Sequence, residues 1–174
     1  MPYLQHYVEQ KEGKPISYWS LVHKNVLVPL GAGDFSLLKS IEPDSSEGIP
    51  LLAYGAWPTL DNAAKIALLF ANEGNHKGQQ LIHKEKCKEA LGRTYWKGYD
   101  TGNDYRGKYY RHSFWATSLK TDKCIINLTY MLGYDGNYVW FLPSGTIAIR
   151  FMDEYDLNFS SLIKHIEKIQ SSCS

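Results

Sequence analysis

The sequence has few cysteines and no long hydrophobic stretch. Its three cysteines, Cys87, Cys124 and Cys173, stand far apart, with no C-x-x-C pair. This sparse set, with an odd number of cysteines, predicts reduced thiols. It argues against a disulfide framework and against a metal site built on cysteine. No apolar run approaches the length of a membrane span, and the first residues lack the apolar core of a signal peptide. We therefore expect a soluble, cytoplasmic chain, whose parent protein could still be exported.

A surplus of one charge is also absent. The formal net charge is +1, and no basic run exceeds two residues. This balance argues against binding to nucleic acid or to an anionic membrane. The sequence is instead rich in aromatic side chains, which make up 14% of its 174 residues and include 13 Tyr and 5 Trp. Such a content is typical of sheet surfaces and pocket walls.

The periodicity of apolar residues changes near residue 93. Before it, helical spacing predicts helices at residues 3–11, 18–31, 60–70 and 83–91. Ser17 and Thr59 are expected to cap the second and third helices, and Pro29 and Gly31 to end the second. Residues 31–57 lack a sustained period and predict a long loop, which in a compact domain usually has a function.

After residue 93 the pattern favours strands. Residues 108–119 alternate as a strand, and residues 137–142 and 146–151 predict a hairpin through the turn Pro143-Ser144-Gly145. An amphipathic helix is expected at 157–171. This order predicts an α+β fold, with helices followed by an antiparallel sheet and a C-terminal helix. We expect one domain over residues 1–174, with a helical part at 1–92 and the sheet plus closing helix at 93–174.

Common catalytic and cofactor motifs are missing from the sequence. GAGDF at residues 31–35 follows a predicted helix and not a strand, which excludes a dinucleotide-binding loop, and no Walker loop or EF-hand is present. The spacing of the histidines supports no metal site, so we expect neither a metal nor a cofactor. One formal match is Ser36-Leu-Leu-Lys39, because an S-x-x-K pair that begins a helix lets a neutral lysine take the proton of the serine. It lies in the long loop, where barely one helical turn has room.

Three stretches of the sequence, taken in order, carry a family resemblance. They are EGKPISYWSLVHKNVLVPLGA (12–32), GAWPTLDNAAKIALLFANEGNHKGQQLI (55–82), and YYRHSFWA followed by GYDGNYVWFLPSGTIAIRF. Together they resemble the PLG turn, the following helix and the closing strand pair of β-lactamase-related serine hydrolases. This family includes class C β-lactamases, D,D-peptidases, esterases and 6-aminohexanoate-dimer hydrolases. The resemblance implies the C-terminal half of the β-lactamase/penicillin-binding-protein fold.

The resemblance also implies a substrate-binding segment. The family's nucleophile is the serine of an S-x-x-K motif, a Tyr-x-Asn or Ser-x-Asn motif serves proton transfer, and a Lys-Thr-Gly or His-x-Gly motif binds the substrate carboxylate. The third motif falls on Tyr134-Asp135-Gly136, followed by Asn137. Gly136 keeps the glycine, where a side chain would block close approach of a substrate. Tyr134, or Asp135 after a shift of one residue, replaces the family's cation.

The other two motifs are expected ahead of this chain. The family's S-x-x-K helix precedes the PLG turn, whereas Ser36 and Lys39 follow it, so the resemblance does not support Ser36 as the nucleophile. It implies that the chain is inactive by itself. Apolar side chains such as Trp19, Leu69 and Phe70 would then need cover from an N-terminal complementing segment or from self-association.

Three interpretations of function stay open. The first is the C-terminal portion of a serine hydrolase that acts on a small ester, amide or β-lactam. The second is a catalytically inactive descendant of that family, acting as a binding or assembly module. The third is an α+β domain to which the resemblance does not apply, since fold alone does not settle function.

Overall fold

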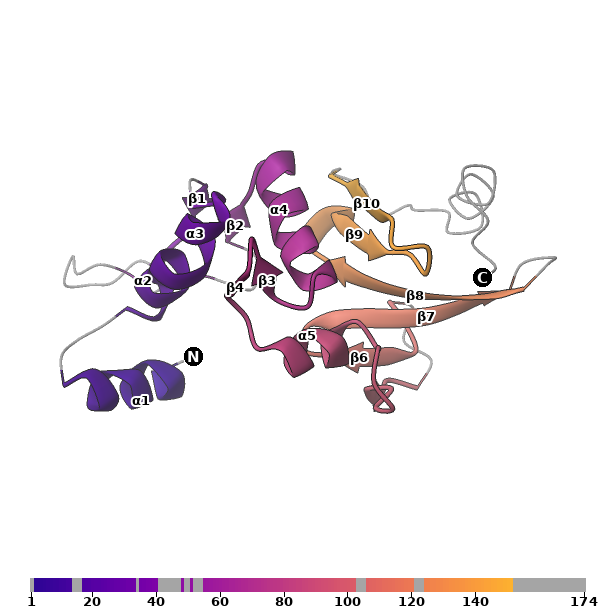
Figure 1. The fold of residues 1–174 in the computed structure, drawn as a ribbon, viewed down its shortest axis with the longest axis horizontal. Coiled ribbons are helices and arrows are strands. Elements are labelled where there is room, and N and C mark those ends of the chain that lie inside the picture. The colour runs from indigo at the N-terminus through magenta and orange to yellow at the C-terminus, as the bar shows by residue number, and fades with distance from the viewer. Residues whose placement is uncertain are drawn as a thin grey trace. The chain divides into compact units, whose positions relative to one another are not determined.

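The computed structural model describes residues 2–13, 17–33, 35–40, 48, 51, 55–102, 106–120 and 124–151, without the side chains of 2–5 and 135. The chain divides into two compact units, residues 1–66 and 67–174. The fold is α+β: helices come first along the chain and an antiparallel sheet follows (Figure 1). This confirms the predicted class. The helix expected at 157–171 lies outside the described residues.

The first unit begins with short helices. Helix α1 spans Pro2–Glu12, and α2 (Tyr18–Val22) continues through a π-helical turn (His23–Leu27) into α3 (Val28–Leu30). Pro29 was expected to end this segment but lies inside α3, directly after the wide π turn, in which the Val28 N–H reaches back to the His23 carbonyl. The helix ends at Gly31, whose φ of 69° allows the Gly31 and Ala32 N–H groups to bond to the last turn.

Two short strands follow and lead into a long helix. β1 (Ser36–Leu37) pairs antiparallel with β2 (Ala56–Trp57). Helix α4 (Leu60–Ala71) begins after Thr59, whose Oγ1 accepts the Asn62 N–H at 3.2 Å. Thr59 is therefore the predicted N-cap.

A tight connection leads from α4 to the next helix. After α4 the chain turns at Glu73 and Gly74, both of which have positive φ. The hairpin of β3 (Asn75–His76) and β4 (Gln79–Gln80) follows and turns at Lys77–Gly78. The N–H groups of Leu81 and Ile82 both donate to the Gly74 carbonyl, at 2.8 and 3.2 Å. Helix α5 (Lys84–Ala90) follows, as predicted. Gly74 is thus the point where the chain after the hairpin returns to the end of α4.

Within the described residues the sheet has six strands, and each pairs antiparallel with its neighbour in sequence (Figure 1). Their order is β10 (Ile147–Arg150), β9 (Tyr138–Phe141), β8 (Ile125–Leu132), β7 (Phe114–Lys120), β6 (Tyr109–Arg111) and β5 (Tyr99–Asp100). The predicted hairpin through Pro143–Gly145 is confirmed as β9–β10, with Phe141 opposite Ile147.

The prediction of one strand over residues 108–119 is wrong. The chain reverses at His112 and Ser113, so that Arg111 faces Phe114 across the β6–β7 hairpin. His112 and Ser113 have φ values of 43° and 70°. A two-residue turn with positive φ at both positions matches the twist of the strands and usually carries Asn or Gly. The sequence therefore gives no signal for this turn.

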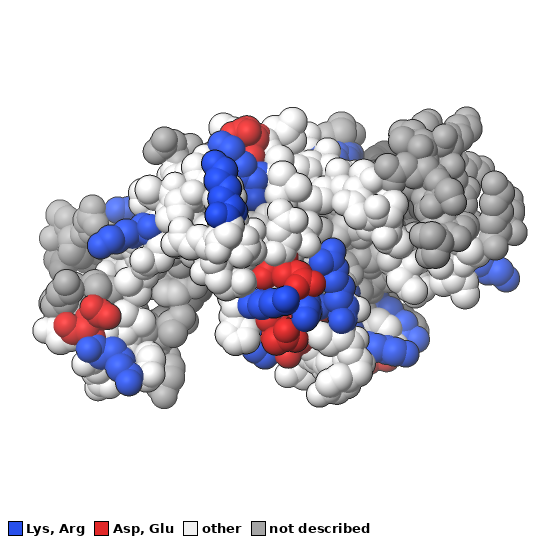
Figure 2. All heavy atoms as spheres, viewed as in Figure 1, with Lys and Arg blue, Asp and Glu red and all other residues white. Residues whose placement is uncertain are grey.

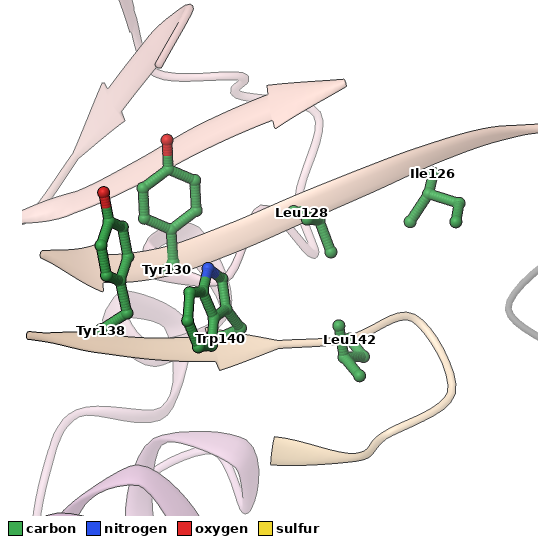
Figure 3. Packing of buried hydrophobic residues seen from close by; sticks show 6 residues of the cluster. All are labelled: Ile126, Leu128, Tyr130, Tyr138, Trp140 and Leu142. Carbon is green, nitrogen blue, oxygen red and sulfur yellow. The ribbon is translucent and has the colours of Figure 1, made fainter. Parts of the chain in front are cut away.

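The two faces of the sheet have different contents. On one face Phe114, Val139 and Phe141 pack with Ala67 of α4 and Ala90 of α5. The opposite face carries a row of directly paired residues that runs across the strands: Tyr99, Tyr110, Trp115, Tyr130, Trp140 and Ala148. Exposure falls along this row from 73% at Tyr99 to 1% at Tyr130. The row ends in the buried cluster shown in Figure 3, where the Tyr138 and Trp140 rings stack at 4.9 Å.

A buried arginine joins the sheet to the end of α5. Arg111 is 6% exposed, and its guanidinium donates to the Ala90 and Lys97 carbonyls, at 3.1 and 3.2 Å, and to Thr129 Oγ1. The Thr129 hydroxyl in turn donates to the Leu91 carbonyl at 3.3 Å. A cation is favourable there because the last carbonyls of a helix carry partial negative charge. We call Arg111, Thr129 and these three carbonyls the arginine clamp.

The cysteines differ in state. Cys87 is a free thiol with no exposed surface, and burial is the main cause that raises its pKa. Cys124 is disulfide-bonded. The prediction of reduced thiols is therefore wrong for Cys124, because sequence spacing says nothing of which side chains the fold brings together.

Candidate functional site

The segment singled out by the resemblance is a tight turn between two strands of the sheet. Residues Tyr134–Gly136 form one 3₁₀ turn between β8 and β9. The Gly133 N–H donates to the Asn137 carbonyl at 2.8 Å, and the Asn137 side-chain amide donates to the Tyr134 carbonyl. Gly136 is buried and has a φ of 78°, a conformation that favours glycine. We call residues 133–137 the β8–β9 turn.

The turn presents an aromatic ring to solvent. Tyr134 is 68% exposed, and Asn137 is half-buried with its amide held inside the turn. Only the backbone of Asp135 belongs to the described residues. The predicted substrate-binding residues Tyr134, Gly136 and Asn137 are thus brought together within a single turn.

A cation does approach the turn from another strand. Arg150 at the end of β10 lies opposite Tyr138 in the sheet, and its Nη1 donates to the Gly136 carbonyl at 3.4 Å, a long hydrogen bond. Sequence reasoning missed Arg150 because only the register of the β9–β10 hairpin brings it back to the turn. Counting residues outward from the Pro143–Gly145 turn could have placed it there.

The formal S-x-x-K pair has the wrong local geometry for catalysis. Ser36 lies in strand β1, opposite Trp57 of β2, and Lys39 follows in extended chain. In a strand, side chains three positions apart point to opposite faces, whereas one helical turn would bring them together. Ser36 and Lys39 therefore lack the geometry in which lysine activates serine. They also belong to the first unit, while the β8–β9 turn belongs to the second.

Metal chemistry has no support from the described side chains. Across the part of the chain that the structure describes, no group of three or more His, Cys, Asp and Glu residues could hold a metal ion. Among the same residues, no helix has both the length and the apolar character needed to cross a membrane.

Several described titratable groups with shifted pKa values lie around α5. Figure 2 shows acidic and basic side chains intermixed over this helix, where Lys84 pairs with Glu73 and Lys88 with Glu85. Glu89 Oε2 lies 2.7 Å from both Lys86 Nζ and His112 Nε2. The hydrogen bond from Lys86, followed by that from His112, lowers the pKa of Glu89. These are ion pairs around the helix, a structural cause of shifted pKa values.

We predict that Glu89 stabilises the fold in a pH-dependent way. Because its pKa is lowered in the folded chain, its contribution is complete above the ordinary glutamate pKa of about 4.3 and is lost as the pH falls through the lowered value. Glu89→Gln should therefore lower the unfolding midpoint in urea at pH 7, and the difference from the unmodified chain should disappear in acid. Lys86→Gln should reproduce part of the loss at pH 7. A difference that stays constant from pH 7 to pH 3 would contradict this role.

No protein-family model matches the chain, and no curated protein is significantly similar to it in sequence. The β8–β9 turn offers an exposed phenol and backbone groups, and the guanidinium of Arg150 lies nearby. Groups of these kinds can form hydrogen bonds with a polar ligand.

Proposed function

We propose that this chain is the C-terminal portion of a β-lactamase-like serine hydrolase, in which the sheet unit supplies one wall of an acyl-transfer site. The observation that carries the proposal is the β8–β9 turn. There a buried glycine with positive φ lies in the turn that joins β8 to β9, at the position that resembles the family's Lys-Thr-Gly or His-x-Gly motif. The order of helices before an antiparallel sheet also supports it.

In this proposal the turn positions the substrate and another segment attacks it. A serine from an S-x-x-K helix of a complementing N-terminal segment adds to the carbonyl carbon of an ester, amide or β-lactam. The leaving group departs with a proton, and water then hydrolyses the acyl-enzyme. Gly136 leaves room for the substrate backbone beside β9, while Tyr134, Asp135 and Asn137 border it. No cofactor takes part.

The proposal predicts labelling only in the complemented protein. The 174-residue chain alone should not react with a fluorophosphonate or a β-lactam probe. When mixed with a separately expressed S-x-x-K segment encoded upstream, it should permit labelling of the serine in that segment. Gly136→Asn should reduce this labelling at least about tenfold, because it places a side chain in the substrate path.

The matched control is Gly145→Asn, in the distal turn of the β9–β10 hairpin. Gly145 also has a positive φ, of 84°, and open space around it, so labelling should persist. Asparagine tolerates this conformation better than other side chains. Labelling of the chain alone at Ser36, or the absence of labelling in every mixture, would contradict the proposal.

A second candidate function is a catalytically inactive binding or assembly module. It is favoured by Tyr134 at the position of the family's cation and by the extended conformation of Ser36-Lys39. Tight binding of the upstream segment, or self-association, without labelling by any probe would favour this function over the first.

A further inference from the structure

One edge of the six-stranded sheet carries exposed aromatic side chains. Tyr99 of β5 and Tyr110 of β6 are 73% and 36% exposed, and they lie directly opposite each other. Tyr110 in turn lies opposite Trp115 of β7, with the two ring centres 4.7 Å apart. Because directly opposed side chains project from the same face of a sheet, these rings form one continuous strip. It is the exposed end of the row of paired residues that becomes buried at Tyr130.

Two further rings extend this strip at the side of the β6–β7 turn. The Trp96 ring meets the Tyr99 ring edge-on at 5.6 Å and the His112 ring at 5.3 Å. His112 is exposed, and Trp96 and Trp115 are half-buried. A contiguous exposed patch of this kind marks a binding surface more often than scattered exposed rings do. We call Trp96, Tyr99, Tyr110, His112 and Trp115 the aromatic strip.

A cation lies against the aromatic strip. The Arg106 guanidinium is 4.6 Å from the centre of the Trp115 ring, and Arg106 is exposed. The Arg106 carbonyl accepts a hydrogen bond from the Tyr130 hydroxyl. The next residue, Gly107, packs closely on β7, where a Cβ would lie 3.0 Å from the Ala116 carbonyl oxygen. Contacts with β7 and β8 therefore set the position of this cation on the strip.

Charge is unevenly distributed along the chain. Residues 93–120, which contain the aromatic strip, include six basic and two acidic residues. Their net charge is +4, whereas the rest of the chain carries −3. The basic residues are Arg93, Lys97, Arg106, Lys108, Arg111 and Lys120, of which only Arg111 is buried. The overall charge of +1, which argues against a nucleic-acid partner, thus conceals a basic region that contains the exposed rings.

We propose that the aromatic strip binds single-stranded nucleic acid. Such a strand carries bases that stack on aromatic side chains and phosphates that attract Lys and Arg. A guanidinium that lies on a ring also offers its own plane to a base and its N–H donors to a phosphate. A neutral sugar would use the rings without the cations, and an anionic membrane would use the cations without the flat ring faces. A single strand uses both sets of groups.

Fluorescence anisotropy of a labelled oligothymidylate tests the proposal with the full chain. The chain should bind the oligonucleotide at low salt. Tyr99→Ala and Tyr110→Ala should each weaken binding about fivefold or more, because each removes a ring on which a base stacks. Tyr99→Phe keeps the ring and should keep the affinity. Tyr7→Ala is the matched control and should leave binding unchanged, since Tyr7 is also exposed and has Lys11 Nζ 5.8 Å from its ring centre, but lies in α1.

The dependence of binding on salt separates the rings from the cations. Arg106→Gln should weaken binding and reduce the slope of log K against log salt by about 0.7, the contribution of one phosphate contact on a single strand. The tyrosine variants should keep the slope of the unmodified chain, because they remove no charge. Lys24→Gln removes one exposed charge from the first unit and should change neither the affinity nor the slope.

Three results would overturn the proposal. The first is no binding of the oligonucleotide at low salt, or equal binding by the unmodified chain and by folded Tyr99→Ala and Tyr110→Ala variants. The second is competition by polyglutamate as effective, charge for charge, as competition by unlabelled oligothymidylate, which would indicate a surface for polyanions in general. The third is cosedimentation with phosphatidylserine vesicles that the same tyrosine variants abolish, which would assign the strip to a membrane surface.

Discussion

Replacing Arg111 by Met should lower the free energy of unfolding by about 3 kcal/mol or more. The substitution keeps most of the side-chain volume but removes every donor that holds the arginine clamp. Arg111 donates hydrogen bonds to the Ala90 and Lys97 carbonyls and to the Thr129 hydroxyl. After the substitution these three acceptors lose a hydrogen-bond donor in a buried position. An unsatisfied buried polar group costs about 1–3 kcal/mol. The loss is measured by urea unfolding followed by circular dichroism.

Two further variants distinguish the loss of the arginine clamp from the general effect of replacing an arginine. Arg93 is exposed and donates one hydrogen bond, to the Ala71 carbonyl at 2.9 Å, so Arg93→Met should cost no more than about 1 kcal/mol. Arg111→Lys should not restore stability, since an ammonium lacks the planar fork that reaches three separate acceptors. Equal losses for Arg111→Met and Arg93→Met would refute the clamp.

Gly74→Ala should be among the most damaging single changes in the sheet unit, with a loss of about 3 kcal/mol or more. A Cβ at this position would lie 2.2 Å from the Ile82 carbonyl oxygen and 2.9 Å from its carbon. Both atoms are backbone, and the Ile82 and Leu81 N–H groups are bonded to Gly74 itself, so relief of the clash would break this connection. The φ of 80° adds strain for any residue with a Cβ.

Gly78→Ala is the control for that strain. Gly78 has a φ of 87° and no atom within 4 Å of the position a Cβ would occupy. Its replacement should cost only the conformational term, about 1 kcal/mol. The difference between the two variants in urea unfolding measures the steric contribution at Gly74. Similar losses for both variants would mean that the close approach to Ile82 is not a constraint.

Local signals in the sequence were sufficient for several elements. Thr59 predicted the start of α4, because its hydroxyl accepts a hydrogen bond from an N–H three residues away. Pro143–Gly145 predicted the β9–β10 hairpin, because these turn residues adjoin both strands. In each case the interacting residues lie within a few positions of one another, so the local sequence is enough to predict the element.

The sequence did not predict features whose hydrogen-bond partners lie far away along the chain. Arg111 looked like an alternating polar position of a strand, yet its acceptors lie 14, 18 and 21 residues away. The reversal at His112–Ser113 uses residues that rarely adopt positive φ. Arg150 reaches the β8–β9 turn only through strand register. Ser36 illustrates the converse, because a motif read without its backbone conformation suggested a pairing that a strand does not allow.

The neighbour-to-neighbour order of the sheet also bears on how this unit acquires its structure. Directly opposed residues are at most 15 positions apart in the chain, the separation of Trp115 and Tyr130. Closing a short loop costs little entropy, and proteins with local contacts cross a lower kinetic barrier. Each hairpin can therefore form before the next is made, as the chain emerges during synthesis. The six strands should assemble by stepwise zipping, faster than is usual for sheets whose strands meet from distant parts of a sequence.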